Sequence, residues 1–179
     1  MNTKTDGVQQ NGISDRPLDA FDRTILGELE EDAGQSYARL GERVGLSAPA
    51  VHERVKKMRR SGALRKISAI IDPVAAGKNL LAFVHVDTHG WGKSQHLMRI
   101  AEHPEVEEIH SVAGDACMLL KVRTRDTHDL EALLSELYAT PGVKATRSYV
   151  VLSTYLERPV QAGVTEVWPE VVMPETVSH

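Results

Sequence analysis

Residues 40–58 read LGERVGLSAPAVHERVKKM, and this stretch decides the fold of the N-terminal part of the chain. Apolar residues recur at helical spacing on both sides of Gly45. Gly45 suits the left-handed conformation that ends a helix, and Ser47 is a good N-cap for the next helix. Pro49 follows in the first turn, where its missing N–H costs nothing. The stretch therefore predicts two helices joined by a short turn, a helix-turn-helix.

The second of these helices has one apolar face and one basic face. Val51, Val55 and Met58 fall on the same side because an α-helix has about 3.6 residues per turn. Between Ser47 and Lys66 there are seven Lys and Arg residues and one Glu, although the net charge of the whole chain is -4. A basic segment on an acidic body suits a protein that presents one face to a polyanion. The alternative interpretation is an ordinary solvated surface helix.

This helix-turn-helix predicts a binding face for double-stranded DNA. Residues in the first turn of the recognition helix are expected nearest to the base edges, and its lysines nearest to the phosphates. Arg54 suits either role. Arg65 and Lys66, on a predicted wing, either extend the basic face or only solubilise the chain. The predicted DNA-binding residues are Ser36, Tyr37, Ser47, Ala48, Pro49, Ala50, His52, Glu53, Arg54, Lys56, Lys57 and Arg60.

Composition and periodicity divide the chain into five parts. The N-terminal part contains three predicted helices and then a short strand over Ile67–Ile71. The ends of the chain are polar or proline-containing and show no sustained periodicity. The parts are a disordered leader (1–17), a winged helix-turn-helix domain (18–72), a linker (73–79), a second domain (80–158) and a C-terminal tail (159–179).

Strands and helices alternate in the second domain. Leu130, Leu133, Leu134 and Leu137 form a helical stripe. The remaining predicted elements are a helix over 94–103 and strands over 80–87, 106–112, 118–124 and 143–156. The order βαββαβ predicts a ferredoxin-like domain, so the fold class is α+β. One face of its sheet would be bare in a monomer, and homo-oligomerisation through the sheets is expected.

Motifs in both halves resemble the Lrp/AsnC (feast/famine) family of transcriptional regulators, from Leu18 to about Leu156. The effector half of the resemblance consists of Val112-Ala113-Gly114-Asp115, Leu119-Leu120-Lys121-Val122 and Pro141-Gly142-Val143. The N-terminal half consists of Leu18-Asp19, Asp22, Ile25-Leu26, Leu29, Val44-Gly45-Leu46-Ser47, Val51, Arg54-Val55, Gly62 and Asp72-Pro73.

The resemblance implies a sequence-specific DNA-binding transcriptional regulator whose DNA affinity or assembly responds to an amino acid or related metabolite. It also implies dimers that assemble into tetramers or octamers. A glycine turn lets backbone N–H groups approach a carboxylate, and Asp115 can pair with an ammonium group. A plain hairpin turn is the alternative interpretation of Gly114-Asp115. The implied effector-binding residues are Val112, Ala113, Gly114, Asp115, Ala116 and Cys117, with Thr146, Ser148 and Thr154 on the last strand.

Residue types and spacing argue against an enzyme, a cofactor or a metal site. Cys117 is the only cysteine, so paired thiolates are excluded. The eight histidines show no metal-binding spacing. The alternative is an enzyme like the sirohaem decarboxylases, which resemble the same two-domain fold, and it would recruit His85, His110 or Arg123. The concentrated charge of the recognition helix favours DNA instead.

Two further features of the sequence bear on location. The first 17 residues contain no apolar stretch that could act as a signal peptide. No apolar run approaches the roughly 20 residues of a membrane span. A cytoplasmic, nucleoid-associated protein is therefore expected.

Overall fold

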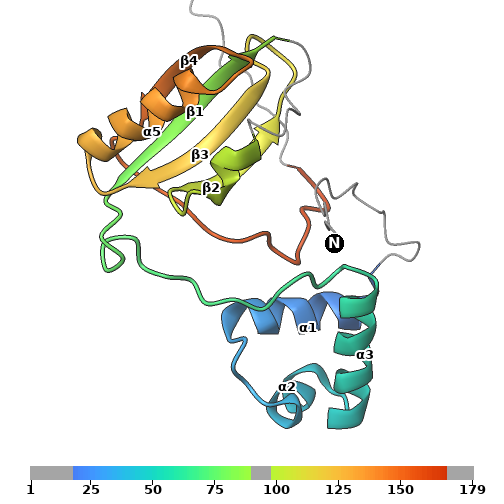
Figure 1. Ribbon diagram of the computed structural model, residues 1–179. Helices are drawn as coiled ribbons and strands as arrows, with labels where there is room; N and C mark the ends of the chain where they lie inside the picture. The colour runs from blue at the N-terminus through green and yellow to red at the C-terminus, as the bar shows by residue number, and fades with distance from the viewer. Residues whose placement is uncertain (1–17, 90–97, 169–179) are drawn as a thin grey trace, which may run out of the picture. The chain divides into compact units, whose positions relative to one another are not determined.

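The computed structural model describes residues 18–89 and 98–168, and the chain divides into two compact units. The first unit contains residues 1–69 and 158–179, and the second contains residues 70–157 (Figure 1). The predicted leader, the last part of the predicted tail and the start of the helix predicted over 94–103 lie outside the described residues. None of the described helices is long and apolar enough to cross a membrane.

Three helices and their caps form the first unit. Asp19, Ser36 and Ser47 are the N-caps, and each side chain accepts a backbone N–H of the first turn. Gly45 is left-handed at φ 73° and ends the second helix. The predicted Ser47 cap and Gly45 turn are thus confirmed. The helices are α1 (Ala20–Glu31), α2 (Tyr37–Val44) and α3 (Ala48–Arg60) (Figure 1).

The crossing of α2 and α3 is closed by backbone contact. Leu46 donates its N–H to the carbonyl oxygen of Gly41 at 2.9 Å. A Cβ placed on Gly41 would lie 2.4 Å from the carbonyl oxygen of Leu46. The apolar side chains behind this crossing are fully buried, notably Ile25, Leu40 and Val51. Glycine at this position therefore lets the turn and the first residue of α3 lie directly against α2.

The second unit is a four-stranded antiparallel sheet in the order β2-β3-β1-β4, with α5 on one face (Figure 1). This is the predicted ferredoxin-like order. Its core lies between the sheet and α5, where Val84, Leu120 and Leu137 are fully buried. The elements are β1 (Leu80–Thr88), the 3-10 helix η1 (Arg99–Glu102), β2 (Val106–Ser111), β3 (Met118–Thr124), α5 (Thr127–Ala139) and β4 (Val143–Val150).

Two strand predictions were wrong in extent or existence. The predicted strand Ile67–Ile71 is irregular chain with its isoleucines exposed, because no described strand lies beside it to pair with. The wing predicted there is therefore absent as a strand. The last strand was predicted over 143–156 but ends at Val150. Its last register partner on β1 is Ala82, and the N–H of Val151 still bonds the carbonyl oxygen of Leu81, near the start of β1.

The helix predicted over 94–103 is described only in its last part. There Met98 is α-helical and Arg99–Glu102 form the 3-10 helix η1, with Ile100 buried in the core of the sheet unit. Pro104 follows directly and prevents the helix from continuing.

We expect Gly41→Ala to lower the free energy of unfolding of the first unit by about 1–3 kcal/mol, because the new methyl group must displace backbone. Gly27→Ala is the matched control. It lies within α1 with nothing inside 4 Å of an added Cβ, and it should stabilise the helix by about 0.5–1 kcal/mol. Urea unfolding of both variants measures the difference, and equal stability of the two would contradict the close approach.

Candidate functional site

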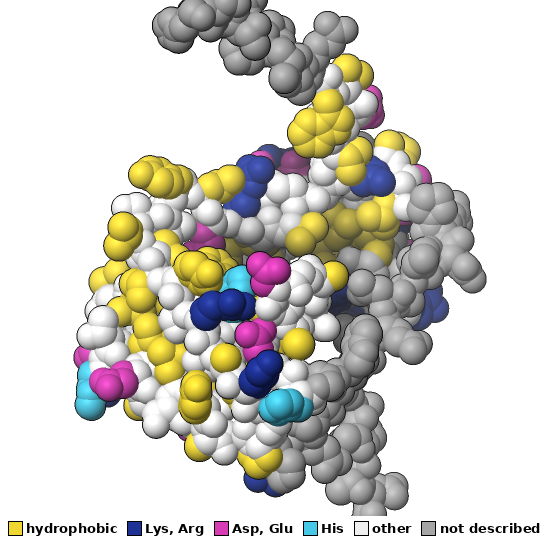
Figure 2. Space-filling model, turned by 90° about the horizontal axis from the view of Figure 1, so that it is seen from above, with side chains coloured by type: hydrophobic (Ala, Val, Ile, Leu, Met, Phe, Trp, Pro, Cys, Tyr) yellow, Lys and Arg dark blue, Asp and Glu magenta, His cyan; other side chains and the backbone are white. Residues whose placement is uncertain are grey.

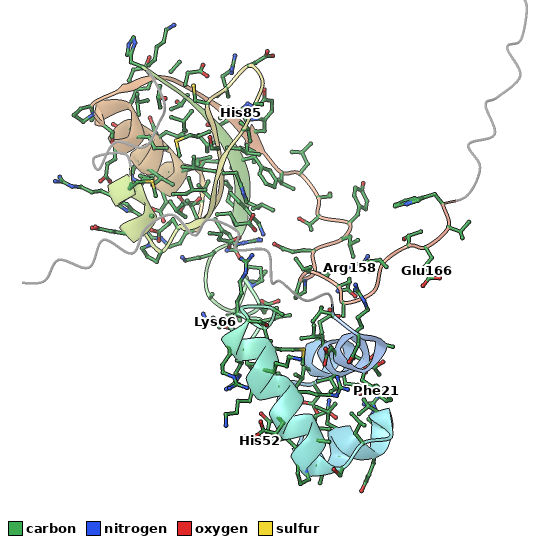
Figure 3. All side chains as sticks on the ribbon, turned by 90° about the vertical axis from the view of Figure 1, so that its right-hand side faces the viewer. Phe21, His52, Lys66, His85, Arg158 and Glu166 are labelled. Atoms are coloured by element: carbon green, nitrogen blue, oxygen red, sulfur yellow. The ribbon has the colours of Figure 1, made fainter. Side chains whose placement is uncertain are left out.

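The exposed face of α3 carries most of the predicted DNA-binding residues. His52, Lys56, Lys57 and Arg60 are all exposed, whereas Val51, Val55 and Met58 on the opposite face are buried. Figure 3 shows His52 near the start of α3 and Lys66 just beyond its end. Three basic residues occupy the last turn, where they also oppose the negative end of the helix dipole.

Arg54 is half-buried and has carboxylate partners within its own unit, and its predicted DNA contact stays a prediction. Its Nη1 donates to Asp19 Oδ2 at 2.7 Å and to Asp22 Oδ1 at 2.8 Å. Its guanidinium also lies 5.3 Å from the centre of the Phe21 ring. The hydrogen bond to Asp19, followed by that to Asp22, raises the pKa of Arg54 above its ordinary value. Arg54 therefore ties α3 to the start of α1.

The start of α2 lies beside the first turns of α3. The rings of Tyr37 and His52 are 5.5 Å apart and tilted by 46°. The hydroxyl oxygens of Ser36 and Ser47 accept backbone N–H groups as helix caps. Glu53, the one acidic member of the predicted face, lies 3.8 Å from Lys56. The remaining first-turn residues, Ala48, Pro49 and Ala50, are exposed or half-buried on the same helix.

The predicted effector loop is the connection between β2 and β3. Val112 donates its N–H to the carbonyl oxygen of Cys117 at 3.1 Å, which closes the loop. Gly114 has φ +147°, a conformation that favours glycine. Asp115 and Ala113 are exposed, whereas Ala116 is buried beneath them. The loop therefore presents backbone and one carboxylate to solvent.

Arg147, on β4, is a neighbour of this loop that sequence reasoning missed. Its Nη2 donates to the main-chain oxygen of Asp115 at 3.1 Å and lies 3.5 Å from Asp87 Oδ2. The side chain is half exposed, with its remaining N–H groups free among the described residues. A basic residue alternating with the predicted Thr146 and Ser148 was the signal available in the sequence.

The three other predicted effector residues lie at different distances from the loop. Thr146 pairs with Val86 of β1, which in turn pairs with Met118 at the end of the loop. Thr146 therefore lies at the loop end of the sheet, and Ser148 lies one step further along β4. Thr154 lies beyond the last strand and is exposed. The structure groups the loop with Thr146 rather than with Thr154.

The sheet face opposite α5 carries a compact group of ion pairs. Arg123 is only 8% exposed. Its Nε donates to Glu107 at 2.7 Å, and its Nη2 donates to Glu157 at 2.9 Å. Lys121 pairs with the same two carboxylates. The hydrogen bond from Lys121 lowers the pKa of Glu157, partly offset by burial. Arg123 is therefore neutralised within the chain.

The histidines considered for an enzyme site have partners of their own. His110 lies 2.8 Å from Glu108 on its own strand, and the His85 ring lies 5.1 Å from that of Tyr149 (Figure 3). No group of three metal-ligating side chains occurs among the described residues. On the face that Figure 2 shows, basic and acidic side chains lie among apolar ones without a continuous basic patch.

The fold and the exposed face together define a helix-turn-helix DNA-binding regulator with a ferredoxin-like second unit. The sequence model of the AsnC-type helix-turn-helix domain matches residues 18–59, and that of the Lrp/AsnC ligand binding domain matches residues 81–161. The chain is 35% identical over 141 residues to HTH-type transcriptional regulator FL11 of Pyrococcus horikoshii, covering 79% of this chain and 93% of that protein. It belongs to the Lrp/AsnC family of transcriptional regulators.

Other relatives agree with this assignment. The leucine-responsive regulatory protein of Serratia marcescens is 36% identical over 151 residues, covering 82% of this chain and 90% of that protein. The crystal structure of the leucine response regulatory protein LrpA of Mycobacterium tuberculosis has a TM-score of 0.70 at 33% identity, with 82% of this chain and all of that chain covered. These relatives are named as regulators, so the prediction of a regulator rather than an enzyme is confirmed.

A complex of a Neisseria meningitidis regulator with L-Met is a further structural neighbour. Its TM-score is 0.71 at 26% identity, with 79% of this chain and 94% of that chain covered.

We expect Arg54→Ala to lower the free energy of unfolding by about 1–3 kcal/mol, because it leaves the carboxylates of Asp19 and Asp22 without their shared cation. Arg59→Ala, which removes an exposed cation of the same helix, is the control and should change stability little. Urea unfolding distinguishes the two variants. If Arg54→Ala were as stable as Arg59→Ala, the ion pairs between Arg54 and the start of α1 would contribute nothing to the free energy of unfolding.

Proposed function

We propose that this chain is a homo-oligomeric regulator that reads specific DNA sequences with α3 and responds to an amino acid or related metabolite bound at the 112–117 loop. The observation that carries the proposal is the division of α3 into a buried apolar face and an exposed basic face. A helix of this kind, following a closed helix-turn-helix, fits the major groove of DNA.

On DNA, the first turn of α3 and its basic residues have different roles. Ala48, Pro49, Ala50 and His52 are closest to the base edges, where small side chains and an imidazole discriminate among bases. Lys56, Lys57 and Arg60 lie further along the helix and contact phosphates. Two recognition helices of a dimer would enter successive major grooves about 34 Å apart on a pseudo-palindromic site.

The effector is proposed to be a small zwitterion. The backbone around Gly114 suits a carboxylate, and the exposed Asp115 suits an ammonium group. Arg147 holds the main chain of the loop in place. The neighbouring regulator that binds L-Met supports an amino acid as the class of ligand. Small Ala116 and Cys117 leave room for an apolar side chain. No cofactor is invoked.

Assembly is proposed to use the sheet face opposite α5. Tyr149 is 55% exposed there, and Phe83, its partner on β1, is only half-buried. Apolar and aromatic side chains on an open sheet face are typical of a homodimer interface. Dimers would then build tetramers or octamers, and effector binding would shift that assembly and the DNA affinity. We place the protein in the cytoplasm, associated with the nucleoid.

We expect Lys56→Ala to weaken binding to every DNA sequence and to make the salt dependence shallower, because a phosphate contact is lost. His52→Ala should change sequence preference more than overall affinity. Gel shifts at several salt concentrations, with operator and random DNA, measure both effects. Lys144→Ala, an exposed lysine of β4, is the control. Wild-type behaviour of the Lys56 and His52 variants would refute the role of α3.

We expect Asp115→Ala to abolish the thermal shift that a screen of amino acids produces with the wild-type protein, because the ammonium partner is lost. Arg147→Ala should reduce the same shift by freeing the loop. Glu131→Ala, an exposed substitution on α5, is the control, and all three variants should still bind DNA. A full thermal shift in the Asp115 variant would move the effector site elsewhere.

A further inference from the structure

Residues 158–168, called the strap below, contact the first helix of the DNA-binding unit through Gln161 and Ala162. Arg23 Nη1 donates to the main-chain oxygen of Ala162 at 3.0 Å. Gln161 Nε2 donates to Glu30 Oε1 at 2.5 Å and also lies 3.1 Å from the carbonyl oxygen of Pro159. The strap therefore makes two polar contacts with α1, and it belongs to the same compact unit as the helix-turn-helix.

The two contacts fall on one face of α1. Arg23 and Glu30 are seven positions apart, which places them on the same side of the helix two turns from each other. Ile25 and Leu29 form the opposing set, which is buried in the core of the unit. The strap thus uses a face of α1 that the helix-turn-helix core leaves open.

Glu157, the residue before the strap, is held separately in the sheet unit. Its carboxylate accepts hydrogen bonds from Lys121 and, at 2.9 and 3.0 Å, from Arg123. The cation pair on β3 therefore fixes the point where the chain leaves the sheet unit. Glu157 is thereby held by polar contacts within the sheet unit, and Gln161 and Ala162 are held by polar contacts within the DNA-binding unit.

The strap contributes little apolar burial to the contact with α1. Val160 is 96% exposed and Trp168 is 77% exposed. The Gln161 hydrogen bond is exposed and the Arg23 hydrogen bond is only part-buried, so each is individually weak and the attachment is reversible. The family's ligand-binding domain matches only as far as residue 161, so the Ala162 anchor lies beyond it.

We propose that the Arg23–Glu30 face of α1 is a docking surface for residues 158–168 of the same chain. The chain passes between the two units twice, once in the linker after α3 and once at residues 157–158. Docking on α1 makes the second passage a further attachment of the DNA-binding unit. Because α1 packs on α3 and shares the Arg54 tie with it, the strap supports the helix that presents the basic face.

Amide hydrogen exchange of the full chain tests the docking. The double variant Arg23→Ala, Gln161→Ala removes both donors, and exchange in α1 should accelerate about five- to twentyfold. Truncation after Val160 should reproduce this acceleration, whereas truncation after Trp168 keeps both anchors and should leave α1 unchanged. Glu42→Ala, an exposed change on α2, is the point-variant control. Unchanged exchange in the double variant, or acceleration after the Trp168 truncation, overturns the proposal.

Cross-linking decides which chain supplies the strap. Cysteines are introduced at Gly27, one turn along α1 from Arg23, and at Ala162, which contributes only its main-chain oxygen, so both anchors remain. A Cys117→Ser background is used, and the pair is joined with a short bifunctional maleimide. A product that migrates as a monomer on a denaturing gel is expected. A product that migrates as a dimer would show that the strap docks on a second copy and would overturn docking within one chain.

Discussion

The backbone contact where α2 crosses α3 sets the geometry on which the DNA-binding unit depends. With Gly41 against the carbonyl of Leu46, the turn that leads into α3 folds back onto α2 until main chain meets main chain. The left-handed Gly45 then turns the chain within a single residue, and the Ser47 cap starts α3 at once. With α3 held in this position, Val51 and Val55 are buried in the core, and the basic residues on the opposite side of the helix are exposed to solvent. The exposed basic face of α3 therefore depends on glycine at positions 41 and 45.

Local chemistry made this part of the fold predictable from sequence. Caps, a left-handed glycine and a helical repeat each act within a few residues, so Gly45 and Ser47 could be placed correctly. Strands are different because they require a partner. Ile67–Ile71 has strand composition but no described neighbour. The last strand ends at Val150, paired with Ala82 near the start of β1, rather than where its own apolar pattern ends.

The interaction partners of long side chains could not be predicted from the sequence. Arg54 lies among basic residues in sequence, yet its partners are two carboxylates more than thirty positions earlier. Arg147 reaches the effector loop from another strand, 32 positions away. In both cases the choice depends on which elements the fold brings together. Periodicity predicts the face of a helix or strand, but it does not predict the partner of a long cationic side chain.

The distribution of ion pairs explains how an acidic protein presents a basic face. Arg43 lies 2.7 Å from Glu28, Arg125 pairs with Asp129, and Arg123 is enclosed by two glutamates. On α3, by contrast, Lys57, Arg59 and Arg60 form no ion pair with any described residue, and Glu53 is the only acid. Acidic side chains thus neutralise the structural cations elsewhere and leave Lys57, Arg59 and Arg60 of α3 uncompensated. An uncompensated cluster attracts phosphate over about a Debye length, roughly 8 Å at physiological salt, so the net charge of the chain is a poor guide to its partner.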